Sequence, residues 1–168
     1  KQIYPNGPNK KIKINSLENK LCGKTRPGHF KAVVDVVDRF IKIINPKYIY
    51  LGKKDMQQLK IIEHFLYKKK IKTKVIGCKT IRERSGIAYS SRNSLLTLAE
   101  KKIGSEIYKL LKKKKNKLIK NNISLNKKRK KIFILGVKKI DYIKILDINK
   151  WVKFTKKKKK LKDFYFIL

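Results

Sequence analysis

The sequence predicts an α/β fold, in which a doubly wound parallel sheet with helices is followed by a small α+β unit. Three observations lead to this prediction. Helical and strand-like patterns alternate between residues 28 and 78, their connections are short, and the composition shifts toward lysine and asparagine between residues 112 and 131. We therefore expect two domains, at residues 1–95 and 96–168. The length is sufficient for an apolar core.

The first helix is expected between Gly28 and Asn45, because apolar residues recur there at helical spacing and Pro46 ends the pattern. These apolar residues are Val33, Val36, Val37, Phe40, Ile41 and Ile44. Residues 47–51 form a short run of β-favouring residues that ends in Gly52. A strand is therefore predicted directly after the helix.

The second helix is expected to open at Asp55, because Asp55 and Gln58 have the spacing of a capping box. Its apolar residues are Met56, Leu59, Ile62, Phe65 and Leu66. Residues 73–78 predict the next strand. Because one helix joins two strands through short connections, the strands should be parallel and the crossover right-handed.

Residues 79–96 show no regular period and predict a long loop after the second strand. Thr97 and Glu100 predict a second capping box, which opens a helix that should end in the lysine run at residues 112–115. The apolar residues of this helix are Ile103, Ile107, Leu110 and Leu111. The loop is therefore expected to lead into a helix of about four turns.

The last part of the chain predicts two strands, at residues 142–146 and 164–168. They would be joined through Trp151 and a five-lysine turn at residues 156–160. Together with the preceding helix, they make up the expected α+β unit.

The net charge of +37 has two explanations. Basic side chains that line one face would bind a phosphate backbone. However, only six of the 48 basic residues are arginines, although phosphate and base recognition favour arginine. Lys, Ile, Asn, Tyr and Phe, which are all abundant, are encoded by A/T-only codons. We therefore attribute the lysines to an AT-rich genome and expect no specific nucleic-acid partner.

Other composition features exclude several classes of protein. Cys22 and Cys78 form no CxxC pair, which favours a reduced intracellular protein. The two histidines, His29 and His64, form no cluster with metal-ligand spacing. No apolar run approaches the length that a bilayer requires. We expect a soluble cytoplasmic protein without a membrane partner.

Polar residues that suit a ligand site follow both predicted parallel strands, at residues 52–58 and 82–93. In open parallel sheets, ligands bind beyond the carboxyl ends of the strands, so these segments should converge on one cleft. The expected side chains are Lys54, Asp55, Gln58, Ser90, Ser91 and Arg92. They suit a polyphosphate with its metal ion and a small polar substrate. As alternatives, Asp55 and Gln58 could be only a helix cap, and the serines part of an ordinary polar loop.

Several motifs, in this order and spacing, resemble the pantothenate synthetase family. They are KQIYPNG at 1–7, LCG at 21–23, RPGHF at 26–30, LGKKDMQQ at 51–58 and GIAYSSRN at 86–93, the last preceded by Arg82. The resemblance is dense over residues 1–111 and looser, but collinear, to residue 168. Three ordered motifs together make it specific.

The resemblance implies a nucleotidyltransferase-type, Rossmann-like domain followed by a small domain that closes over the site. It implies a ligase that condenses pantoate with β-alanine to pantothenate, through a pantoyl adenylate, and releases AMP and pyrophosphate. The cofactors would be ATP and Mg²⁺. Pantoate and β-alanine would be the small-molecule substrates, and the enzyme would be a homodimer.

The same resemblance implies roles for single residues. Lys54 would contact the ATP phosphates, Asp55 the ribose or metal side, Gln58 pantoate, and Ile81 the adenine through its backbone. The residues lining ATP would be Gly52, Lys53, Lys54, Asp55, Ile81, Tyr89, Ser90, Ser91 and Arg92. Those serving catalysis would be Lys54, Ser90, Ser91 and Arg92. Cations fixed where pyrophosphate leaves would stabilise the transition state of adenylation. No residue is assigned as a metal ligand.

Some positions depart from the family pattern. The family usually has Glu where Lys53 stands, Asp at Ser85 and Leu at Ile87. Neither histidine of this chain stands in the family's HxGH-type signature, whose histidines stabilise the adenylation transition state. The chain also starts at Lys1 and ends on an apolar run. We therefore expect a fragment that lacks the N-terminal HxGH segment and is inactive alone.

Two alternatives remain open from the sequence. A lysine-rich nucleic-acid-binding protein would carry clustered arginines and exposed aromatic residues on one face. The scattered distribution of the lysines disfavours this alternative. Another adenylate-forming nucleotidyltransferase would share the fold, and the Gln57-Gln58 pair after GKKD distinguishes the two.

Overall fold

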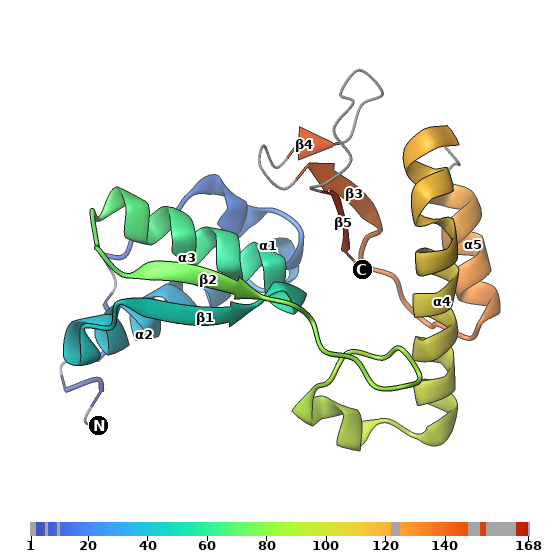
Figure 1. Ribbon diagram of the computed structural model, residues 1–168, viewed down its shortest axis with the longest axis horizontal. Coiled ribbons are helices and arrows are strands. Elements are labelled where there is room, and N and C mark those ends of the chain that lie inside the picture. Colours follow the sequence, from blue (N-terminus) through green and yellow to red (C-terminus); the bar gives the residue numbers. More distant parts are fainter. Residues whose placement is uncertain are drawn as a thin grey trace. The chain divides into compact units, whose positions relative to one another are not determined.

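A computed structural model describes residues 3–5, 7–9, 11–121, 125–147, 152–153 and 164–167. The chain divides into two compact units, unit 1 at residues 1–80 and unit 2 at residues 81–168 (Figure 1). This division lies upstream of the boundary expected near Leu95. The loop from Ile81 onward groups with unit 2 because it packs on the long helix there, as described below.

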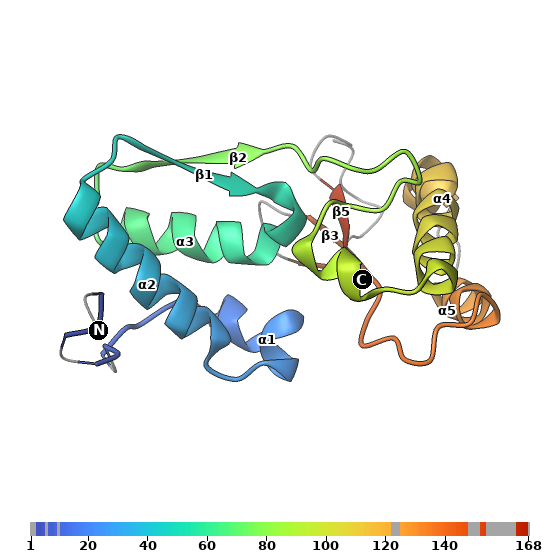
Figure 2. The same cartoon turned by 90° about the horizontal axis from the view of Figure 1, so that it is seen from below.

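Unit 1 contains a parallel pair of strands, as the sequence predicts. Strand β1 (Tyr48–Gly52) pairs with β2 (Lys74–Cys78), and Tyr48 lies opposite Lys74. The helices are α1 (Cys22–Thr25), α2 (His29–Ile44) and α3 (Met56–Lys68), and the 3-10 turns are η1 (Ser16–Asn19) and η2 (Lys53–Asp55). Figure 2 shows α2 and α3 on the same side of the two-stranded sheet.

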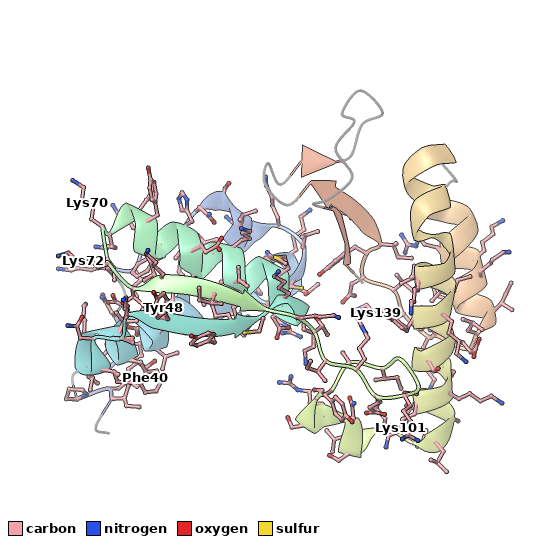
Figure 3. The ribbon with its side chains drawn as sticks, in the orientation of Figure 1. Phe40, Tyr48, Lys70, Lys72, Lys101 and Lys139 are labelled. Atoms are coloured by element: carbon pink, nitrogen blue, oxygen red, sulfur yellow. The ribbon has the colours of Figure 1, made fainter. Side chains whose placement is uncertain are left out.

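The core of unit 1 lies between the sheet and these helices. Its buried apolar residues are Leu17, Leu21, Phe30, Val34, Ile41, Met56, Leu59, Ile61, Ile62, Phe65 and Leu66. The strands alternate between half-buried and exposed residues, so one sheet face covers α3 and the other carries exposed tyrosines such as Tyr50. Phe40, which the periodicity assigns to the buried stripe of α2, is exposed (Figure 3). Ile44 is also exposed. The buried face of α2 is therefore narrower than expected.

A polar network fixes the N-terminal segment of unit 1 onto α2. Arg39 donates hydrogen bonds to Ile3 O, to Gly7 O and to Asp35 Oδ1, each at 2.9 Å, and its guanidinium stacks 4.4 Å from the ring of Tyr4. Asn9 N–H donates to Asp35 Oδ2 at 2.9 Å. Asp35 is buried, which disfavours its charged form, but these donors outweigh burial and lower the pKa of its carboxyl group.

Unit 2 contains helices α4 (Leu98–Asn121) and α5 (Leu125–Ile134) and the 3-10 turn η3 (Ser91–Leu95). Its strands β3 (Lys144–Asp147), β4 (Val152–Lys153) and β5 (Phe164–Ile167) form an antiparallel sheet in the order β4-β3-β5. The two strands predicted from the sequence are thus β3 and β5, with bounds that differ by one or two residues. Trp151 and the lysine turn at 156–160 lie outside the described residues.

Helix α4 differs from the prediction at its end, not at its start. Thr97 and Glu100 form the predicted capping box, with three hydrogen bonds of 2.8 to 3.2 Å between them. The helix then continues through the lysine run to Asn121, because lysine is a good helix former even where its charges repel. Helix α5 has no counterpart among the elements predicted from the sequence. None of the helices in the described part of the chain has the length and apolar character of a membrane span.

Candidate active site

The first predicted segment lies at the carboxyl end of β1. Gly52 ends the strand, η2 follows, and α3 begins at Met56, so residues 52–58 lie where a parallel sheet usually holds its ligand. Gly52 has an ordinary φ of −67°, and a Cβ built on it would meet only the backbone N of Lys54, at 4.0 Å. The fold of unit 1 therefore does not require glycine at position 52. A ligand that approaches the backbone closely would require it, because any side chain would be in the way.

The two lysines of this segment differ in their surroundings. A Cβ built on Gly77 of β2 would lie 3.0 Å from Lys53 Cε, so the aliphatic stem of Lys53 crosses the second strand. Lys54 is exposed and follows in the same turn. The Lys53 stem is thus in contact with the sheet while its ammonium group can still reach solvent.

The capping box expected from Asp55 and Gln58 does not form. Asp55 occupies the N-cap position of α3, but its side chain makes no capping hydrogen bond. The reason lies in the backbone: η2 runs directly into α3, and Asp55 has φ −100° and ψ 55° in place of the extended conformation from which an N-cap side chain folds back. Asp55 is exposed and Gln58 half-buried.

Gln57, to which the sequence assigned no contact, is the most constrained polar residue of the segment. Its side chain is buried, with 4% of its surface exposed. Nε2 donates to Leu17 O at 2.8 Å and to Lys20 O at 2.7 Å, and Oε1 accepts from Cys22 N–H at 3.2 Å. These bonds fasten η1 and α1 to the first turn of α3. No spacing signal reveals this, because the partners lie 35 to 40 residues away.

The partners of Gln57 surround a strained corner. Leu21 has φ 49° and ψ −121°, a conformation that a side chain disfavours, and Gln57 binds the backbone groups on both sides of it. A Cβ on Gly23 would lie 1.7 Å from Glu18 O, so only glycine fits there. The LCG motif is therefore explained by the folding of this corner.

The second predicted segment forms a small hairpin in unit 2. Glu83 N–H donates to Ile87 O at 2.8 Å and Tyr89 N–H donates to Ile81 O at 3.1 Å. Gly86 turns the chain with φ +94°, and a Cβ there would lie 2.3 Å from the ring of Tyr108. This hairpin replaces the irregular loop that the sequence predicts.

Two side-chain contacts dock the hairpin on α4. Ser105 Oγ donates to Ser85 O at 2.6 Å, and the Arg82 guanidinium lies 4.2 Å from the ring of Tyr108. Arg82 also donates to Gly86 O at 3.1 Å. The position of the hairpin is therefore set by the side of α4 that carries Ser105 and Tyr108.

The residues predicted to bind ATP in unit 2 lie on this hairpin and in the turn after it. Ile81 and Tyr89, paired across the hairpin, are 65% and 61% exposed. Ser90 is the N-cap of η3, and its Oγ accepts from Arg92 N–H at 3.3 Å. Ser91 and Arg92 are exposed. The structure thus brings the unit 2 set together and, separately, the unit 1 set. That the two sets form one cleft stays a prediction.

Histidine and acidic residues give no metal centre in the part of the chain that the structure describes. No group of three His, Cys, Asp or Glu side chains lies close enough to hold a metal ion there. His29 begins α2, and its ring lies 5.2 Å from that of Phe30; His64 lies within α3. Neither Cys22 nor Cys78 forms a disulfide in the described part of the chain.

Comparison with known proteins identifies the family. The family model described as Pantoate-beta-alanine ligase matches residues 1–167. The chain belongs to the pantoate-beta-alanine ligase family. Among curated relatives, the pantothenate synthetase of Clostridium botulinum (strain Langeland) is 37% identical over 150 residues, and the match covers 87% of this chain and 53% of the relative. The pantothenate synthetase of Leptospira interrogans is 38% identical over 152 residues, covering 88% and 53%.

Solved structures of this ligase family confirm the α/β fold of the nucleotidyltransferase type. Pantoate-beta-alanine ligase from Francisella tularensis, in complex with beta-gamma ATP and beta-alanine, is 36% identical with a TM-score of 0.73, covering 84% of this chain and 52% of that one. Pantothenate synthetase from Thermus thermophilus is 26% identical with a TM-score of 0.78, covering 91% and 57%. The chain spans about half the length of the ligases it matches.

Proposed function

We propose that this chain supplies the ATP-phosphate region and one side of the pantoate site of a pantothenate synthetase. The observation that carries the proposal is the position of GKKDMQQ at the carboxyl end of a parallel strand, in a chain that belongs to the pantoate-beta-alanine ligase family. The ATP and beta-alanine of the Francisella complex support the choice of ligands.

The reaction has two steps. A carboxylate oxygen of pantoate attacks the α-phosphorus of ATP, the bond from that phosphorus to the bridging oxygen breaks, and pyrophosphate leaves. The amine of β-alanine then attacks the acyl carbon of the pantoyl adenylate, AMP leaves with the acyl oxygen, and the amine loses a proton. The first step needs positive charge near the leaving pyrophosphate, and the second mainly needs positioning.

The predicted residues suit these needs. Lys54 and Arg92 supply the positive charge at the phosphates, and the hydroxyls of Ser90 and Ser91 donate to phosphate oxygens. Gln58 hydrogen-bonds pantoate. Gly52 lets the backbone approach ATP, Ile81 contacts the adenine through its backbone, and Lys53, Asp55 and Tyr89 complete the lining.

Mg²⁺ fits this site as an ion held mainly by ATP. Such an ion usually takes one or two carboxylates, phosphate oxygens and water. Asp55 is the one carboxylate of residues 52–58, and it is exposed and makes no capping bond. When bound, the ion would neutralise charge on the phosphates.

The whole enzyme requires more than this chain contributes. We infer that unit 2 includes the small domain that closes over the site, that the complete ligase is a cytoplasmic homodimer, and that this chain alone does not turn over. The test incubates the chain with Mg-ATP, pantoate and β-alanine and measures pantothenate. No product is expected, and measurable turnover would contradict the inferred inactivity.

Nucleotide binding tests the proposed site itself. We expect a non-hydrolysable ATP analogue, measured by calorimetry at about 0.15 M salt, to bind about tenfold more weakly to Arg92→Ala than to the native chain. Arg84→Ala is the matched control, because it removes the same charge from an exposed position of the same loop. In a chain of net charge +37, a loss of affinity shared by both variants would indicate general attraction of anions and refute the site.

The nucleic-acid alternative has one observation in its favour. Tyr48, Tyr50 and Tyr67 are exposed in unit 1, as that alternative predicts. However, no arginine lies between residues 40 and 81, and membership of the ligase family supports the proposed function instead.

A further inference from the structure

Asn93 is a polar residue of the SSRN motif to which neither the sequence nor the proposed function assigns a role. Its carboxamide Nδ2 donates two hydrogen bonds, to Glu83 Oε1 at 2.7 Å and to Ala88 O at 3.1 Å. Its backbone N–H donates to Ser90 O at 3.0 Å. Asn93 therefore fastens η3 to both strands of the preceding hairpin.

These contacts continue a chain of rigid supports. Helix α4 holds the hairpin through Ser105 and Tyr108, the hairpin carries Glu83, and Glu83 holds Asn93. Between Ala88 and Asn93 lie only four residues, Tyr89 to Arg92. The hydrogen bond from Asn93 to Ala88 O joins the two residues that flank this short segment. Its backbone therefore has few alternative conformations.

The identity of Glu83 adds a second argument. The chain has 11 acidic residues, and this one lies ten residues from Asn93, on the loop where we place a triphosphate. A carboxylate near a polyanion lowers its affinity by repulsion. A carboxylate at this position is understandable if its function is to accept the charge-assisted hydrogen bond from Asn93.

We propose that Asn93 is a positioning residue, which through its bonds to Glu83 and Ala88 holds Ser90, Ser91 and Arg92 in the conformation that binds the triphosphate. The identity of the ligand rests on the proposed function, whereas the ordering of Ser90, Ser91 and Arg92 by Asn93 does not. A residue that served stability alone would be expected to hold a segment that belongs to the core. This segment contributes little to the core, because Ser91 and Arg92 are exposed.

The decisive variant is Asn93→Asp, which keeps the shape of the side chain. It would place a carboxylate against Glu83 and against the carbonyl of Ala88, so both hydrogen bonds would be lost. In the double variant Asn93→Asp with Glu83→Gln, the new glutamine can donate to the new aspartate, and the net charge returns to that of the native chain. The matched charge control is Lys109→Gln, an exposed position on α4.

The first measurement needs no ligand. Amide hydrogen exchange and ¹⁵N relaxation of Ser91 and Arg92 are recorded on the full chain. We expect faster exchange and larger-amplitude motion in Asn93→Asp, native behaviour in Lys109→Gln and partial recovery in the double variant, in which the bond to Ala88 O stays lost, with similar circular dichroism throughout. Should Asn93→Asp unfold, Asn93→Ser provides the same comparison without the added charge. Native order of these amides in the Asn93 variant would overturn the proposal.

The second measurement is the affinity for the ATP analogue. We expect about a tenfold loss in Asn93→Asp, a much smaller loss in Lys109→Gln and an intermediate loss in the double variant, which restores only the bond at position 83. An equal loss in Lys109→Gln would overturn the positioning role. If the native chain binds no ATP analogue, the proposed function fails, and the amide measurements alone still decide whether Asn93 holds the segment.

Discussion

Gln57 of unit 1 and the Thr97–Glu100 pair of unit 2 each make three hydrogen bonds of similar length, but in opposite surroundings. The bonds of Gln57 measure 2.7 to 3.2 Å and are buried or part-buried, whereas those of the capping box measure 2.8 to 3.2 Å and are exposed. Water can replace a lost partner more readily at the second site. The number of hydrogen bonds is therefore a poor guide to stability, and the access of water to their partners is a better one.

Replacement of Gln57 by leucine should cause the largest loss of stability among the variants that test this comparison. It would leave the buried Leu17 O and the part-buried Lys20 O and Cys22 N–H without this partner, and would release the strained corner at Leu21. We expect the free energy of unfolding of unit 1 to fall by about 3 kcal/mol. Urea unfolding measures this, with Gln58→Leu as the control, because Gln58 is the same residue type at the next position and is only half-buried. Equal losses in both variants would contradict the special role of Gln57.

Arg39→Met should have the next largest effect, since it keeps the aliphatic stem but removes the bonds to Ile3 O, Gly7 O and Asp35. We expect a loss of about 2 kcal/mol, because Arg39 is partly exposed and water can reach some of its partners. Limited proteolysis should then cut the segment at residues 3–9 before the rest of unit 1. A native cleavage pattern would show that the segment is held by other contacts.

Thr97→Ala should cost less, about 1 kcal/mol, because the cap it removes is exposed. Thermal unfolding followed at α4 measures this effect. Thr97→Ser is the matched control, since it retains the hydroxyl. A loss as large as that of Gln57→Leu would refute the comparison between buried and exposed bonds.

The smallest expected effect is a pH dependence through Asp35. Because its pKa is lowered in the folded protein, it contributes stability above its unfolded pKa of about 3.9, and this contribution is lost as the pH falls through the folded value. Stability should thus fall more steeply below about pH 4 in the native chain than in Asp35→Asn. Urea midpoints measured between about pH 2.5 and 7 test this, and parallel curves for the two proteins would exclude the contribution.

The parallel strands and the capping box at Thr97 were predictable because their signals are local. Alternating β-favouring residues and a three-residue spacing are enough for both. The cap at Asp55 was predicted wrongly, since the 3-10 turn before α3 changes its backbone conformation. The end of α4 was also predicted wrongly, because the lysine run was treated as a stop although lysine favours helices.

The candidate site was predictable only in part. The ends of the two strands and the polar residues after them can be located from the sequence alone. The contacts of Gln57 could not, because they join segments 35 to 40 residues apart. The same holds for Asn93, whose partner Glu83 is set by the hairpin and not by a period in the sequence.

The contact between Lys53 and Gly77 has a consequence for the evolution of the family. A Cβ at position 77 would lie 3.0 Å from Lys53 Cε and 3.2 Å from Leu59 Cδ1, so a residue larger than glycine there requires these side chains to move. A shorter residue at position 53 would leave that space open. Substitutions at the two positions should therefore be correlated across homologous sequences, although 24 positions separate them along the chain.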